Sequence, residues 1–147
     1  MNRFMQAAYE EAVKNIHGNA GGPFGAVIER NGEIIAAAHN QVLATNDPTM
    51  HAEIAAIRMA ARKLGRFSLE DCALYSTCEP CPMCLGAIMW ARIPVVYYGA
   101  NRVDAEAIGF ADNFIYEYIM GTASENNISL RPLHREECLQ LFKHWEQ

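Results

Sequence analysis

The dipeptide Asn31-Gly32 lies between two apolar runs, and it constrains the first part of the fold more than any other feature. The two runs, residues 24–29 and 33–38, have the composition of β-strands. A type I′ turn needs positive φ at both central residues, and Asn-Gly meets that requirement with little strain. The sequence therefore predicts an antiparallel hairpin near the start of the chain.

Helical and strand patterns alternate after this hairpin. Apolar residues recur at helical spacing in two segments, and short apolar runs typical of buried strands follow each of them. Parallel strands need crossover connections, so we expect an α/β fold with three α/β/α layers around a mixed sheet of about five strands. The predicted helices are residues 4–16, 51–64, 82–92, 114–120 and 135–145, and the predicted strands after the hairpin are 73–77, 95–99 and 128–130.

Length and composition favour one domain spanning residues 1–147. A chain of this size buries enough surface to fold without a metal, so a metal site would need a functional reason. No apolar run approaches the roughly 20 residues that span a bilayer, and no secretion signal is visible. We therefore expect a cytoplasmic protein without a membrane partner. The formal net charge of -5 argues against a nucleic-acid partner.

Cys78, Cys81 and Cys84 are spaced by two residues each. Five cysteines without a secretion signal argue against a disulfide framework and favour metal binding or catalysis. Cys81 and Cys84 stand at the start of a predicted helix, where two thiolates reach one tetrahedral ion and the helix dipole stabilises their charge. Cys78 as a fourth ligand is the alternative, and it would close the site.

His51 and Glu53 form a His-x-Glu triplet at the start of another predicted helix. The triplet occurs twice more in the chain, so its context carries the signal. A βαβ crossover would bring the starts of the two helices together, and His51 would join Cys81 and Cys84. One imidazole and two thiolates favour zinc, and three protein ligands leave a position for water, as in catalytic sites. Glu53 is then placed as a general acid and base.

His51-Ala52-Glu53 followed by Pro80-Cys81-Pro82-Met83-Cys84 resembles the signature of zinc nucleobase deaminases. The chain is similar to the cytidine/deoxycytidylate deaminase superfamily. Within it, residues 21–27, 46–49, 78–88 and 109–116 resemble the bacterial guanine deaminases. The resemblance implies a cytidine-deaminase-like fold, a zinc cofactor and hydrolysis of a free purine base, giving xanthine and ammonia from guanine.

The resemblance also implies contacts with a small nucleobase substrate. Asn40 would hydrogen-bond the base, and Phe24 and Trp90 would enclose the ring. Ala52 would contact the base, and Asp112 would meet its amide edge or assist proton transfer. Members of this branch are homodimers that exchange C-terminal segments, so a homodimer is expected.

Ordinary structural roles compete with these assignments. Asn40 has the residue type that caps turns, and Asp112 precedes an apolar run as helix caps do. Phe24 and Trp90 would also suit a hydrophobic core.

Three other functions compete with the leading one. A tRNA adenosine deaminase would share the zinc site but would need a basic surface for RNA. Another small aminated ring, such as an aminotriazine, cytosine or a pterin, would need only a different pocket. A zinc protein without activity would have no use for Glu53.

Overall fold

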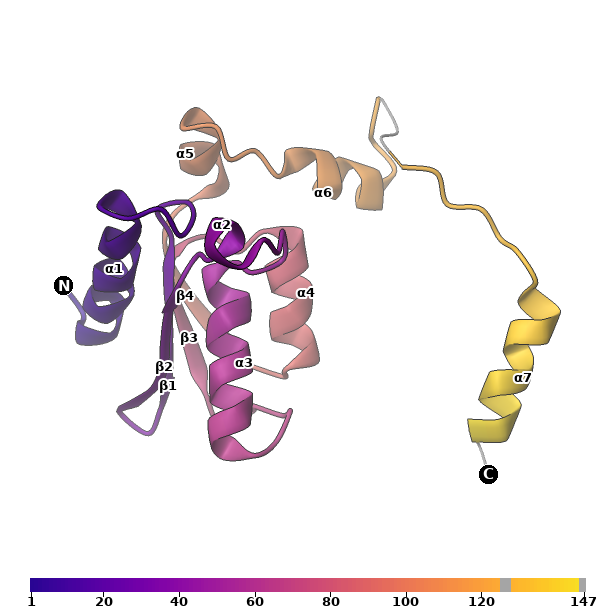
Figure 1. Ribbon diagram of the computed structural model, residues 1–147, viewed down its shortest axis with the longest axis horizontal. Coiled ribbons are helices and arrows are strands. Elements are labelled where there is room, and N and C mark those ends of the chain that lie inside the picture. The colour runs from indigo at the N-terminus through magenta and orange to yellow at the C-terminus, as the bar shows by residue number, and fades with distance from the viewer. Residues whose placement is uncertain (125–127, 146–147) are drawn as a thin grey trace. The chain divides into compact units, whose positions relative to one another are not determined.

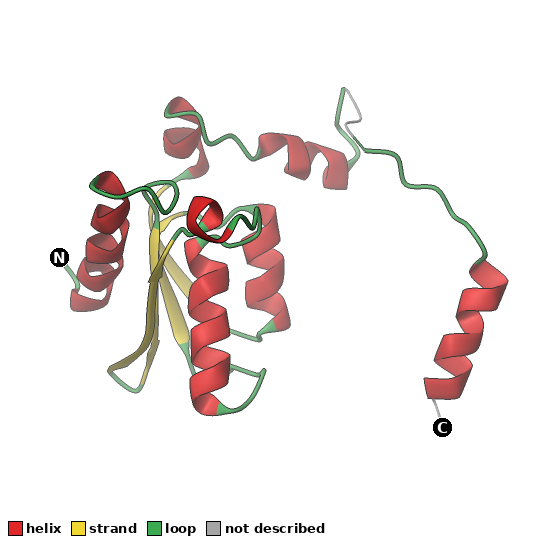
Figure 2. Ribbon diagram, in the orientation of Figure 1, coloured by secondary structure: helices red, strands yellow, loops and turns green. Residues whose placement is uncertain are grey.

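The computed structural model describes residues 1–124 and 128–145. The chain forms two compact units, Met1–Tyr116 and Glu117–Gln147. The first unit contains the sheet and the helices that cover it (Figures 1 and 2).

A four-stranded mixed sheet lies at the centre of the first unit, in the order β2-β1-β3-β4. β1 is antiparallel to both β2 and β3, and β3 is parallel to β4. Asn31 and Gly32 both have positive φ, at 50° and 83°, which confirms the predicted hairpin turn. The strands are β1 (Gly25–Arg30), β2 (Glu33–His39), β3 (Ala73–Cys78) and β4 (Val95–Ala100).

The expectation of about five strands is wrong for the part of the chain that the structure describes. Residues 128–130 have no regular secondary structure. Their apolar side chains suit a strand, but a strand exists only where a neighbour accepts its backbone hydrogen bonds. The sheet therefore ends at β4, whose outer edge has no paired strand among the described residues.

Helices cover both faces of the sheet, which confirms the three expected α/β/α layers (Figure 1). α1 packs on one face, and α3 and α4 lie together on the other. The single turn α2 and the short α5 were not predicted, because each is too short to show a helical period. The helices are α1 (Arg3–Ile16), α2 (Val42–Thr45), α3 (Ala52–Leu64), α4 (Pro82–Trp90), α5 (Arg102–Ala107), α6 (Asn113–Met120) and α7 (Arg135–Trp145).

Small residues let the layers approach closely. A Cβ atom on Gly25 would lie 2.0 Å from the carbonyl oxygen of Ala8, so only glycine allows α1 to pack this near to β1. On the opposite face, Ala52, Ala56 and Ala60 of α3 are fully buried. Their short side chains bring the start of α3 close to the sheet, and this places the residues of the functional site.

The last part of the chain buries little of its own apolar surface. α7 has no buried residue, and its Leu141, Phe142 and Trp145 are 67%, 67% and 88% exposed. None of the described helices is both long enough and apolar enough to cross a membrane.

Candidate metal centre and active site

The first residues of α3 and α4 lie side by side because both helices pack on the same face of the sheet. His51 is the N-cap of α3 and Cys81 is the N-cap of α4. Pro82 occupies the first helical position of α4, where no N–H group is needed. The side chain of His51 makes no capping hydrogen bond, so its imidazole is available to the site.

Three side chains converge at this point. The Nδ1 atom of His51 lies 3.5 Å from the Sγ atom of Cys81 and 3.5 Å from that of Cys84. The ligand atoms of the three residues lie within 4.8 Å of one another, close enough to hold one metal ion. Cys78 does not belong to this group within the described chain, so the three-ligand arrangement is the one the structure supports.

The electrostatics of the group fit a divalent cation. The pKa of the Cys81 thiol is lowered to about 4 by the hydrogen bond from Cys84 and, against the effect of burial, by that from His51. The pKa of Cys84 lies well above its usual range, because its hydrogen bond to Cys81 and its burial both favour the thiol. Two thiolates so close together need a positive charge between them. Two sulfurs and one imidazole are a donor set that zinc prefers.

Glu53 lies beside the ligands, in the first turn of α3. Its side chain is 7% exposed and contacts the thiol of Cys84. Burial raises the pKa of this carboxyl group, and the negative charge of Cys81 raises it further. A carboxyl group with a raised pKa both accepts and returns protons near neutral pH.

Asn40 follows β2 and is 6% exposed. Its Oδ1 atom accepts a hydrogen bond of 3.0 Å from the backbone N–H of Val42, the first residue of α2, so the side chain does cap a turn there. Its Nδ2 atom has no hydrogen-bond partner among the described residues. The structure thus shows a capping role for the oxygen and leaves a donor for a ligand.

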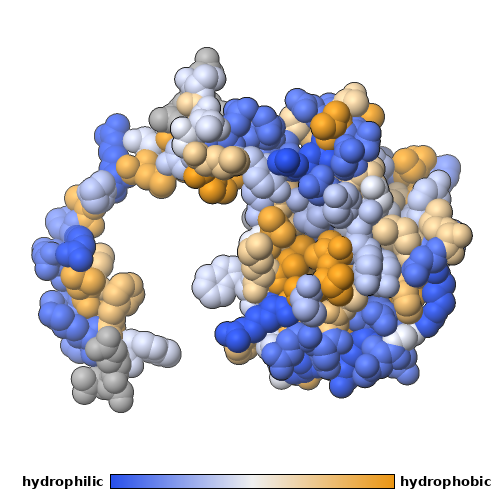
Figure 3. Space-filling model, turned by 180° about the vertical axis from the view of Figure 1, so that it is seen from behind, coloured by the Kyte–Doolittle hydropathy of each residue, from blue (hydrophilic) through white to orange (hydrophobic). Residues whose placement is uncertain are grey.

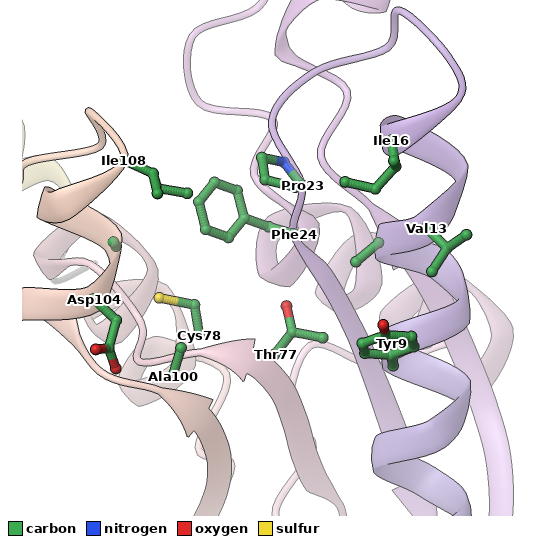
Figure 4. Close-up of a pocket in the computed structure, with 12 residues that line it drawn as sticks. Tyr9, Val13, Ile16, Pro23, Phe24, Thr77, Cys78, Ala100, Asp104 and Ile108 are labelled. Carbon is green, nitrogen blue, oxygen red and sulfur yellow. The ribbon is translucent and has the colours of Figure 1, made fainter.

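Phe24 contacts an aromatic ring that sequence reasoning did not assign to the site. The rings of Phe24 and Phe110 meet edge to face, with centroids 4.9 Å apart. Phe24 also lines a cavity of about 390 Å³ between α1 and α5, together with Cys78 and Asp104 (Figure 4). None of the three metal ligands lines this cavity. The sequence could have indicated Phe110, because it lies two residues before Asp112 in the segment 109–116.

Asp112 and Ala52 lie near the ligands. Burial raises the pKa of Asp112, the charge of Cys81 raises it further, and Arg102 opposes both. Ala52 is fully buried as the first residue of α3, where a backbone N–H has no partner within the helix.

Trp90 is not brought to the ligands. It ends α4, whereas Cys81 caps the start of that helix, and a helix of this length spans about 12 Å. Trp90 is 84% exposed, so it does not pack in the core. The interpretation of Trp90 as a core residue is therefore wrong, because an apolar helical pattern does not tell which of its residues a neighbouring element covers, and its contact with the base stays a prediction.

Residues 1–100 match the family model for the cytidine and deoxycytidylate deaminase zinc-binding region. The chain belongs to this deaminase family. The three converging ligands therefore form a zinc site, which confirms the expected cofactor.

Relatives in this deaminase family cover nearly the whole chain. Guanine deaminase from Bacillus subtilis is 48% identical over 142 residues, which is 97% of this chain and 91% of that protein. The X-ray structure of guanine deaminase from B. subtilis superimposes with a TM-score of 0.93, covering 99% of this chain and 94% of that one at 47% identity. A tRNA-specific adenosine deaminase from Streptococcus pyogenes is 38% identical, covering 95% of this chain and 86% of that protein.

Proposed function

We propose that this protein hydrolyses guanine to xanthine and ammonia. The observation that carries the proposal is the position of the buried Glu53 beside a histidine and two cysteines. The 48% identity to a guanine deaminase supports guanine as the base.

Zinc bound by His51, Cys81 and Cys84 would supply a Lewis acid that makes water acidic near neutral pH. Glu53 would accept a proton from the water that attacks the carbon bearing the amine. It would then return a proton to the departing amine, so that ammonia leaves. The raised pKa of Glu53 suits both steps.

The base would be held by side chains around this centre. The free Nδ2 of Asn40 would donate to an acceptor of the base, and the backbone N–H of Ala52 would supply a second donor. Phe24 would cover the ring, with Phe110 packed against it. Asp112 would accept a hydrogen bond from the amide edge of guanine or assist proton transfer.

A tRNA substrate is less consistent with the charges of the chain. Binding a polyanionic hairpin would need basic groups near the site. The formal net charge of the chain is -5, and the first turn of α7 carries Glu136 and Glu137. Deamination of an aminotriazine, cytosine or a pterin would use the same catalytic group and differs only in the pocket.

The test is ammonia release by the zinc-loaded protein with guanine, cytosine, adenine, an aminotriazine, a pterin and tRNA offered in parallel. We expect turnover of guanine that chelation abolishes. Turnover of another base in place of guanine would refute the substrate while leaving the deaminase chemistry standing. Turnover of tRNA with strong salt dependence would support a tRNA adenosine deaminase instead.

The same proposal includes a homodimer that exchanges C-terminal segments. Exposed apolar side chains gather on one face of the first unit (Figure 3). Met89 and Trp90 of α4 are 67% and 84% exposed, and Tyr97 and Tyr98 on the edge strand β4 are about half exposed. The apolar face of α7 is exposed as well. A second copy of the chain would cover these surfaces, and light scattering that finds a monomer at working concentration would contradict this.

We also propose that residues 1–147 act as a single deaminase domain in the cytoplasm. All five cysteines are free thiols, and a reducing compartment would keep Cys81 and Cys84 able to bind zinc. Recovery of the native protein from another cell fraction would refute the location.

A further inference from the structure

One buried amide beside the candidate base-binding residue has no part in the proposed chemistry. Asn15 of α1 is 8% exposed. Its Nδ2 atom donates to the carbonyl oxygens of Gly22 and Asn40, at 2.7 and 2.9 Å. Its Oδ1 atom has no hydrogen-bond partner among the described residues. The side chain therefore joins two loop segments to α1 and leaves one of its own polar atoms unsatisfied.

The two segments that Asn15 joins also contact each other. The backbone N–H of Phe24 donates to the carbonyl of Gly22, and that of Asn40 donates to the carbonyl of Phe24. Gly21 lies so close that a Cβ atom there would be 2.0 Å from Oδ1 of Asn40. A shift of either segment would consequently move the side chain of Asn40.

The orientation of the Asn40 amide follows from this packing. Its oxygen is the atom that faces Val42, because a backbone N–H donates to it. The Nδ2 atom must then point the other way, and no described residue accepts from it. A base with an acceptor at that place would find the donor already oriented.

We propose that Asn15 is a positioning residue that holds Asn40 in the orientation needed to donate to the base. The inference rests on the proposed role of Asn40 as a base contact. Asn15 acts through the backbone of Asn40 and through the neighbouring Gly22 segment. Holding a donor in place before binding reduces the ordering cost that binding would otherwise carry.

The test is a double-mutant cycle between Asn15→Leu and Asn40→Ala. Leucine keeps the volume of Asn15 and removes both donated hydrogen bonds. We expect Asn15→Leu to lower kcat/KM about tenfold, mainly through KM. This is the size of effect expected when the hydrogen bond from Asn40 to the base is lost. In the Asn40→Ala background the same change should cost less than about twofold, because residues that act through each other are not additive. Equal losses in both backgrounds would overturn the proposal.

A second readout does not depend on activity. The N–H of Val42 is held by the side chain of Asn40, whereas those of Leu43 and Ala44 donate to Ala20. Asn15→Leu should speed hydrogen exchange at Val42 more than at Leu43 and Ala44. Unchanged exchange at Val42 would overturn the proposal. If Asn15→Leu does not fold, Asn15→Ser removes part of the same contact and takes its place.

A matched control separates positioning from loss of stability. Asn2 caps the other end of α1 by accepting from Phe4 and Met5. Asn2→Ala should destabilise the same helix and leave KM unchanged. The double-mutant cycle is measured with whichever base the wild-type protein deaminates. If the wild type does not deaminate guanine, the proposed substrate is refuted, and the cycle with the accepted base still tests the role of Asn15.

Discussion

His51 and Cys84 are 33 residues apart in the chain, yet the Nδ1 atom of His51 lies 3.5 Å from the Sγ atom of Cys84. The pairing depends on two helices that start next to each other on one face of the sheet. The core beneath them is apolar and contains Ile28, Leu69 and Leu74, all fully buried. The site is therefore added to a fold that has its own hydrophobic core.

Removing zinc should abolish activity and leave most of the fold in place, because the core does not include the metal. Ammonia release should stop on chelation, while far-UV circular dichroism changes little. Added zinc should restore turnover. A chelated protein that loses its secondary structure would show that the metal is needed for folding.

Glu53→Gln should reduce turnover by about 10² to 10⁴-fold, the usual contribution of a general acid and base. The amide has nearly the shape of the carboxyl group but cannot carry the proton. Zinc content, measured by atomic absorption, should not change. Glu70→Gln, on the exposed surface, is the matched control and should keep full activity. Full turnover by Glu53→Gln would refute the assigned role.

Gly25→Ala should lower the free energy of unfolding by about 1–3 kcal/mol, as overpacking does in close-packed cores. The added Cβ atom would lie 2.0 Å from the carbonyl oxygen of Ala8 and 2.8 Å from the backbone nitrogen of Ala12. Neither backbone atom moves without shifting α1. Urea unfolding measures the loss, and an unchanged midpoint would contradict the close packing of α1 on β1.

Asp71 predicts a stability change in acid. Hydrogen bonds from Arg66, with a further contribution from Arg30, lower the pKa of this carboxyl group from its ordinary 3.8 to about 2. Because the pKa is lower in the folded chain, the pairs stabilise the protein above about pH 4, and this contribution disappears as the pH falls toward 2. The effect should be small and weaker in salt, since the group is exposed.

Urea unfolding of the wild type and of Asp71→Asn at several pH values between 5 and 2 measures this contribution. The difference between the two proteins should shrink as the pH falls. A constant difference over that range would show that the ion pairs do not stabilise the fold.

Trp90→Glu should shift the proposed dimer toward monomer, because a charge would replace an exposed ring on the surface that a second copy would cover. Phe67→Glu is the control, since Phe67 is also highly exposed, at 73%, but lies outside α4 and β4. Light scattering over a range of concentrations separates the two. A dimer that tolerates Trp90→Glu would place the interface elsewhere.

The sequence by itself determined the hairpin, the longer helices and the identity of the ligands. Asn31-Gly32 specified the hairpin, since few dipeptides accept positive φ twice. Cys81, Cys84 and His51 were identifiable because zinc needs sulfur and imidazole ligands. The residue types and the spacing of such ligands can be recognised in short stretches of the sequence.

Only the tertiary structure decided which residues meet. The apolar pattern at residues 128–130 predicted a strand, but strand formation depends on a neighbour that local sequence does not reveal. Trp90 and Phe110 show the same limit, since one lies at the far end of its helix and the other packs edge to face on Phe24. The hydrogen bonds from Asn15 to Gly22 and Asn40 join segments that are distant in the chain, so no short-range pattern could have indicated them.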